Sequence, residues 1–140
     1  MSAGWFRSAE RRLRGSRGNG SRAVVPPGAL DAGRTFYGDV LGLTEIAPPA
    51  VLGPERVAWF NLGACELHLF LEQDANAVRS GRHLALAVED QNALDLLEAR
   101  VRAAGIEPEE TDVIPNRPRW VIQDPFGNRV ECTAILGPYA

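Results

Sequence analysis

The stretch HLALAVEDQNALDLLEARVRAAG, residues 83–105, carries a strand pattern that is followed directly by a helix pattern. In residues 83–88, leucine or valine alternates with histidine or alanine, which is the period of a strand with one apolar face. Leu94, Leu97 and Val101 then recur at helical spacing, and Gly105 marks the expected end of the helix. This stretch therefore predicts a strand and an amphipathic helix that covers it.

Two further segments alternate in the same way. ELHLFLE (66–72) places Glu66 and His68 opposite three leucines, and RVECTAI (129–135) places Glu131 opposite apolar residues. A sheet of such strands buries its aliphatic face under helices and turns a face with imidazoles and carboxylates the other way. Imidazole and carboxylate are ligands of divalent metals, so this second face is the candidate site.

The order of elements occurs twice along the chain. The sequence ALD lies near the start of both predicted helices, residues 29–42 and residues 89–105, and each helix is followed by a predicted hairpin. Glu66 and Glu131, on the last strand of each half, are 65 residues apart. These matches predict a βαβββ unit that is used twice.

Length and composition define the class of protein further. A chain of 140 residues with 45% hydrophobic content fits one globular domain, and no apolar run reaches the roughly 20 residues of a membrane helix. The two cysteines, Cys65 and Cys132, are too few for a disulfide scaffold. Both are predicted to be buried thiols beside the aliphatic faces, and we expect a reducing, cytoplasmic location.

Charge is divided unevenly along the chain. Residues 1–22 contain six arginines and one acidic residue, whereas the remainder contains nine arginines and seventeen acidic residues. Residues 1–22 are therefore predicted to be a basic, disordered tail, with a shifted start or reading frame as the alternative origin. Residues 23–140 are predicted to be a single domain whose acidic character argues against nucleic-acid binding.

Four motifs in this order resemble the glyoxalase, bleomycin-resistance and extradiol-dioxygenase superfamily, also called vicinal oxygen chelate proteins. They are FYGDVLGL (36–43), ELHLF (66–70), HLALAVED (83–90) and DPFGNRVE (124–131). The resemblance implies an α+β fold in which two βαβββ modules, residues 23–72 and 83–136, form a cupped mixed sheet with helices on its outer face. It also implies a divalent metal such as Zn, Ni, Fe or Mn in the cup.

The resemblance carries family metal ligands onto His83, on the first strand of module two, and onto Glu131, on its last strand. In module one the matching ligand is Glu66 or His68. The internal offset favours Glu66, and the affinity of imidazole for these metals favours His68. Glu131 and Glu66 are also the candidate proton-transferring groups. We expect five further side chains to line the cup: Tyr37, Trp59, Asn61, Phe70 and Arg119.

Two observations qualify this assignment. Subtracting the internal offset of 63–65 residues from His83 leads to residues 18–20, which are Gly-Asn-Gly. The histidine that related sequences carry on the first strand is therefore missing, and absence of the metal is one of the alternatives. A carboxylate such as Glu131, central in an apolar strand, needs either a metal or a cationic partner, for which Arg119 and Arg129 are candidates. The acidic segment EPEETD (107–112) is predicted to be a solvated loop.

The sequence supports two functions. The first is a metal-dependent enzyme of the lyase, isomerase or dioxygenase class, in which the metal chelates neighbouring oxygens of a small substrate. The second is a metal-free protein that binds a drug or another small molecule. In either case we expect a small-molecule partner, no membrane and no nucleic acid. A homodimer is also expected, because proteins of this superfamily can complete the cup by exchanging modules between two chains.

Overall fold

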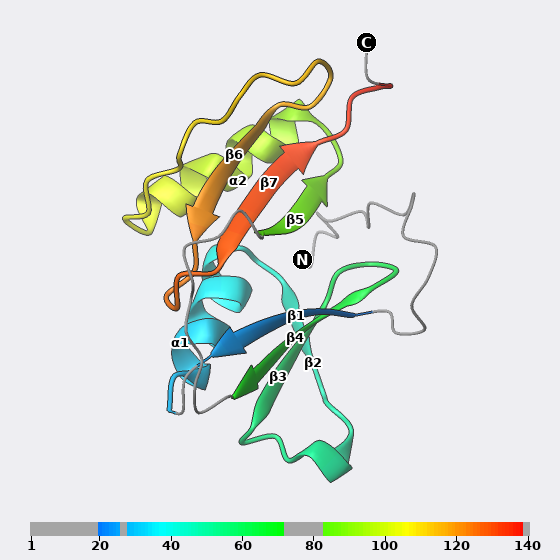
Figure 1. Cartoon of the computed structure of the whole chain (residues 1–140), viewed down its shortest axis with the longest axis vertical. Coiled ribbons are helices and arrows are strands. Elements are labelled where there is room, and N and C mark those ends of the chain that lie inside the picture. Colours follow the sequence, from blue (N-terminus) through cyan, green and yellow to red (C-terminus); the bar gives the residue numbers. More distant parts are fainter. Residues whose placement is uncertain (1–19, 26–27, 72–82, 139–140) are drawn as a thin grey trace.

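The computed structural model describes residues 20–25, 28–71 and 83–138, which form two modules that lie one above the other in Figure 1. The lower module contains β1 (Gly20–Val25), α1 (Leu30–Arg34), η1 (Thr35–Val40), β2 (Thr44–Ile46), η2 (Ala50–Leu52), β3 (Val57–Asn61) and β4 (Glu66–Leu71). The upper module contains β5 (His83–Val88), α2 (Gln91–Ala103), β6 (Arg119–Gln123) and β7 (Arg129–Ala134). The predicted α+β class is confirmed.

The two sheets share one topology and one register. Their strand orders are β1-β4-β3-β2 and β5-β7-β6, and in each the first strand runs parallel to the last. Gly20 pairs with Glu66 and Ala85 pairs with Glu131, so both pairs are 46 residues apart along the chain. The predicted duplication therefore extends to the hydrogen-bonding register.

Module one has the expected βαβββ order, with β2 as a short strand that the sequence pattern did not locate. Module two departs from this order, because in place of the equivalent strand Glu109 makes only an isolated bridge with Val121. The strand β1 begins at Gly20 and pairs with β4 along its whole length. Residues 20–22, which we assigned to the tail, therefore belong to the first strand, and residues 1–19 lie outside the described part of the chain.

The helices begin and end where the sequence indicated. Asp90 caps α2, since its side chain accepts a 2.8 Å hydrogen bond from the Ala93 amide. Gly42 and Gly105 follow the helical segments with φ angles of 76° and 79°, which an L side chain rarely adopts. The first helical segment is only briefly α-helical, and η1 continues it as a π-helix.

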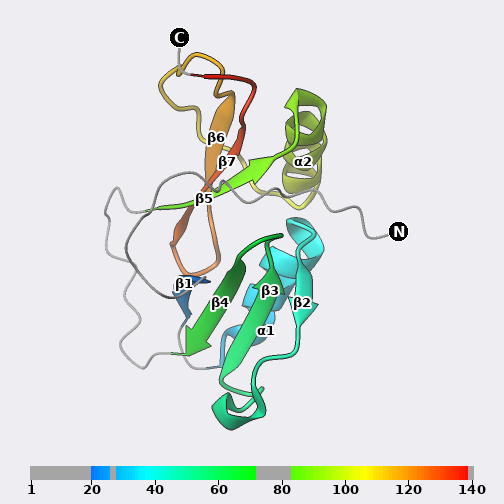
Figure 2. The ribbon, with the colours of Figure 1, turned by 90° about the vertical axis from the view of Figure 1, so that its right-hand side faces the viewer.

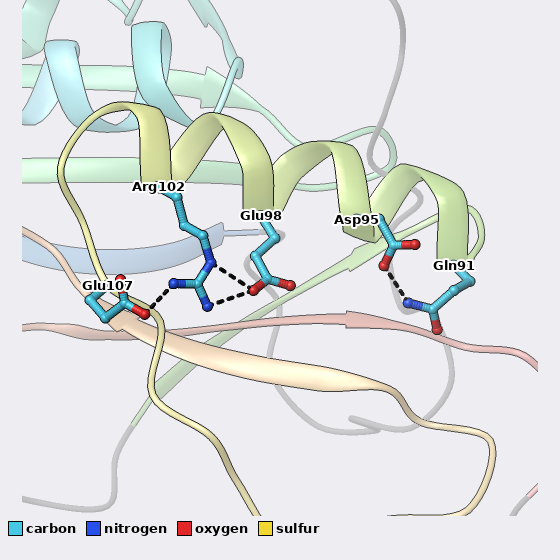
Figure 3. Close-up of polar contacts among 5 residues, drawn as sticks. All are labelled: Gln91, Asp95, Glu98, Arg102 and Glu107. Atoms are coloured by element: carbon cyan, nitrogen blue, oxygen red, sulfur yellow. Dashed lines mark hydrogen bonds and ion pairs between the residues drawn. The ribbon is translucent and has the colours of Figure 1, made fainter.

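The outward face of α2 carries a row of polar contacts, shown in Figure 3. Gln91 donates to Asp95 at 2.7 Å, and Arg102 pairs with Glu98 at 2.8 Å and with Glu107 beyond the helix end. Exposed pairs of this kind contribute only about 0.3–0.5 kcal/mol each. This face is therefore a solvated helix surface that leaves the opposite side of α2 for the core.

One hydrophobic core joins the modules. It contains the apolar faces of both sheets together with residues of α1, η1 and α2, all in a single cluster. The helix α1 packs on β3 and β4, and α2 packs on β5 and β7. Figure 2 shows α1 behind the sheet that contains β3 and β4, and α2 beside the other sheet. The strand faces that were predicted to be aliphatic are therefore the ones that the helices cover.

The two cysteines differ in their burial. Cys132 is fully buried in the core, where burial raises the pKa of its thiol well above the ordinary value. Cys65 packs against the core but is only partly buried. Both thiols are free. None of the helices in the described ranges has both the length and the apolar character to cross a bilayer.

A buried hydrogen bond links the modules at the edge of this core. The Tyr37 hydroxyl in η1 donates to Oδ2 of Asp124, in the turn between β6 and β7, at 2.8 Å. Asp124 is 4% exposed and also accepts bonds from the amides of Phe126 and Asn128. The same burial raises the pKa of Tyr37, so its hydroxyl stays protonated and donates.

Replacing Tyr37 with phenylalanine is expected to lower the free energy of unfolding by about 1–2 kcal/mol, because Asp124 loses one donor in a buried site. Urea titration followed by circular dichroism measures this change. Val51→Ala, at a side chain that is 89% exposed, is the control and should change stability by less than about 0.5 kcal/mol. A Tyr37→Phe variant as stable as the parent protein contradicts the inter-module role of this bond.

Candidate functional site

The polar face of module two is a grid of three strands by three rows, which the register defines. From β5 to β7 to β6, the first row contains His83, Arg129 and Gln123, the second contains Ala85, Glu131 and Val121, and the third contains Ala87, Thr133 and Arg119. Glu131 occupies the centre of this grid. The strands therefore direct a histidine and an arginine from opposite corners toward one carboxylate.

Glu131 interacts with both of these side chains through one oxygen. Arg119 Nη1 donates to Glu131 Oε2 at 2.9 Å, and His83 Nε2 lies 3.5 Å from the same oxygen. The Glu131 side chain is 12% exposed, whereas that of His83 is 43% exposed. The carboxylate is thus held inside the face, with an imidazole at its solvent-facing edge.

Arg119 is only partly satisfied in this position. Besides its bond to Glu131, its Nη2 lies 3.4 Å from the carbonyl oxygen of Asp112, and its buried Nε has no acceptor among the described residues. The sequence predicted that Glu131 needs a partner and named Arg119 or Arg129. The structure confirms Arg119, because Arg129 instead pairs with Glu109 at 3.2 Å.

Glu109 is a residue of this face that the sequence reasoning missed. It lies in the acidic segment that we predicted to be a solvated loop, and its side chain is indeed 50% exposed, but its backbone also bridges to Val121 at the edge of the sheet. That bridge brings the Glu109 carboxylate to Arg129. Nothing in the local sequence EPEETD distinguishes Glu109 from the other acidic residues of the segment.

The polar face of module one contains a second histidine–glutamate pair. His68 and Glu66 lie on β4, with Nε2 of His68 2.9 Å from Oε2 of Glu66. The His68 ring stacks on Trp59, its register partner on β3, with ring centroids 3.7 Å apart and planes inclined by 9°. This stack fixes the plane of the imidazole and so directs Nε2 toward the carboxylate.

The other expected lining residues fall in different places. Phe70 is half-buried and lies two residues after His68 on the same face, and Trp59 is half-buried under the His68 ring. Asn61 is exposed, and its side chain accepts a 2.8 Å bond from the Gly63 amide in the hairpin. Tyr37, expected on the lining, has no exposed surface and lies in the core, because η1 turns its hydroxyl toward Asp124.

The register also identifies equivalent positions in the two modules. Glu66 corresponds to Glu131, since each pairs with the equivalent residue of the first strand in its module. His83 lies two residues before Ala85, and the same step back from Gly20 reaches Gly18, outside the described residues. Module one therefore carries its imidazole on β4, beside the glutamate, instead of on the first strand.

The chain belongs to the Glyoxalase/Bleomycin resistance protein/Dioxygenase superfamily, whose family model matches residues 21–132. This match covers the strands of both modules and the two histidine–glutamate pairs, so the expected family is confirmed. No curated protein matches the chain.

Solved structures show the same relationship. A glyoxalase family protein of Bacillus anthracis is 29% identical, with a TM-score of 0.77 over 89% of this chain and 99% of that one. Lactoylglutathione lyase of Agrobacterium tumefaciens is 26% identical, with a TM-score of 0.61 over 81% of this chain and 90% of that one. A glyoxalase/dioxygenase of Nostoc punctiforme, 23% identical, shares the fold with a TM-score of 0.68 over 91% and 99% of the two chains.

The donors on the two faces fit a divalent metal in kind and come near its spacing, but among the described residues each face brings only two of them together. Two donors about 2.1 Å from one metal lie about 3.0–3.4 Å apart, depending on the coordination geometry. The pairs His68–Glu66 and His83–Glu131 are separated by 2.9 Å and 3.5 Å, close to the ends of this range. Within the described part of one chain, no three histidine, cysteine or acidic side chains come together as a metal site.

Proposed function

We propose that this protein is a metal-dependent enzyme of the glyoxalase type, of the lyase, isomerase or dioxygenase class, which acts on a small substrate with neighbouring oxygen atoms. The observation that carries the proposal is the presence of two histidine–glutamate pairs, whose nitrogen–oxygen distances of 2.9 Å and 3.5 Å are within about 0.1 Å of the spacing expected for two donors on one metal. The identity of 26% with a lactoylglutathione lyase supports the same class of chemistry.

Each metal site is proposed to be completed by a second copy of the chain. The helix-side faces of both sheets are joined in one core, and in the part of the chain that the structure describes each polar face brings no more than two donors together. Module two of one copy, with His83 and Glu131, would then face module one of the other copy, with Glu66 and His68. This arrangement gives a homodimer with two identical sites, as expected for an isologous interface.

The chemistry of such a site follows from its side chains. A divalent metal bound there supplies positive charge that stabilises negative charge developing on substrate oxygens. His83, Glu131 and either His68 or Glu66 of module one would hold it, and a glutamate that coordination leaves available would transfer a proton to or from the substrate. Trp59 keeps the His68 ring in one plane, and Phe70 offers an apolar surface beside it. The substrate is thus expected to be small and polar at one end.

Metal binding is the direct test of this proposal. The purified protein is expected to bind about one Ni²⁺, Zn²⁺, Mn²⁺ or Fe²⁺ per chain, measured by elemental analysis and isothermal titration calorimetry. Removing the His83 imidazole with His83→Ala should weaken the affinity at least about tenfold, because one ligand is lost. Glu109→Gln is the matched control: it removes a carboxylate of the same face that is not a proposed ligand. Equal affinities in all three proteins contradict the proposed ligand set.

A mixing experiment tests the second copy. A Glu66→Gln/His68→Ala variant and a His83→Ala/Glu131→Gln variant are each expected to bind little metal. Refolding them together should yield heterodimers in which one site combines two unaltered modules and one combines two altered modules. These heterodimers should bind one metal each, measured after affinity purification with two different tags. Heterodimers without metal indicate that each site lies within one chain.

A metal-free binding protein is the second candidate function, and one contact favours it. Arg119 already pairs with Glu131 at 2.9 Å, so the partly buried carboxylate has a cationic partner without a metal. The same calorimetric titration distinguishes the two functions. If the protein is a metal-free binding protein, the unmodified chain should take up none of the four metals.

A further inference from the structure

We propose that Arg119 is an internal counter-ion that competes with a divalent cation for Glu131 and thereby sets the metal affinity of the site. This inference rests on the proposed function, because it concerns the same carboxylate. The inference gives a role to Arg119, which is not one of the proposed metal ligands. Arg119 is a positioning residue in this account: it acts on the metal through Glu131.

The first argument is the sharing of one oxygen. Arg119 Nη1 and His83 Nε2 both approach Glu131 Oε2, at 2.9 Å and 3.5 Å. A metal bound by His83 and Glu131 must lie about 2.0–2.2 Å from a carboxylate oxygen, on the side that the imidazole faces. The guanidinium would then stand next to a doubly charged ion, and the two cations repel each other strongly in a partly buried place. Metal binding and the Arg119–Glu131 pair therefore oppose each other.

The second argument is that few hydrogen bonds fix the Arg119 side chain in its position. Its guanidinium makes a single short bond to Glu131 rather than the two-pronged pairing that carboxylate and guanidinium form when the geometry allows. Its buried Nε has no acceptor among the described residues, and its bond to the Asp112 carbonyl is long at 3.4 Å. An unsatisfied buried donor lowers the cost of turning the side chain to a new position. Arg119 is thus placed to release Glu131 when a stronger ligand arrives.

The third argument is the contrast with Arg129 on the same face. Arg129 lies on the same strand as Glu131, two residues before it, but it pairs with Glu109 at 3.2 Å. The face therefore carries two arginine–glutamate pairs, and only one of them involves a candidate metal ligand. Removing either arginine lowers the positive charge of the face by the same amount. Only the removal of Arg119 takes a competitor away from Glu131.

The test compares Ni²⁺ and Mn²⁺ affinities of the full chain by isothermal titration calorimetry. Arg119→Met should bind at least about tenfold more tightly than the unmodified protein, since repulsion by a unit charge within a few ångströms exceeds this factor even when strongly screened. Arg129→Met is the matched control and should change the affinity by less than about threefold. Adding Glu131→Gln to Arg119→Met should remove the gain, as a double-mutant cycle requires for a coupled pair.

Arg119→Gln, which keeps a polar side chain without the charge, carries the same expectation and replaces Arg119→Met if that variant does not fold by circular dichroism. Unchanged or weaker binding by the folded charge-removing variant, with metal bound by the unmodified protein, overturns the role of Arg119 and leaves the proposed function intact. Binding by neither protein overturns both. Binding by Arg119→Met alone supports the counter-ion role and contradicts metal binding by the unmodified chain.

Discussion

The single core between the modules is the constraint on which the rest of this structure depends. Both sheets place their apolar faces on the helix side, and α1, η1 and α2 join these faces into one cluster. The Tyr37–Asp124 bond closes the edge of that cluster, where any unpaired polar group would be costly. Since each sheet has only two faces, the polar residues of both modules are left on the sides that the helices do not cover, with His68 and Glu66 on one sheet and His83 and Glu131 on the other.

Much of this architecture is encoded in local patterns. Alternation along 66–71, 83–88 and 129–134 correctly predicted which face of each strand is buried, because period two is a direct consequence of strand geometry. The equivalence of Glu66 with Glu131 also followed from the internal offset and agrees with the register. What local patterns could not supply are contacts between distant segments. Tyr37 was expected on the lining, but the distant turn at Asp124 gives its hydroxyl a buried partner. Glu109 is exposed as expected, but its pairing with Arg129 depends on a backbone bridge to Val121 that the local sequence does not indicate.

The two histidine–glutamate pairs differ in the side chains that surround them, although they occupy similar faces of the two sheets. In module one, His68 is fixed by an aromatic ring and faces Glu66 directly. In module two, the carboxylate of Glu131 is shared between an imidazole and a guanidinium. A buried carboxylate needs a cationic partner in the absence of a metal, and the strand that carries Arg119 supplies one. The sequence identified this need from the position of Glu131 in an apolar strand, but the choice between Arg119 and Arg129 required the register.

Anomalous diffraction from crystals grown with Ni²⁺ tests the central claim most directly, because it locates the ion and the chains around it in one measurement. The account predicts a peak about 2.0–2.3 Å from donor atoms of His83 and Glu131 of one copy and of Glu66 or His68 of another copy. A peak whose protein ligands all come from one copy, or the absence of a peak at these residues in crystals soaked to saturation, would contradict it.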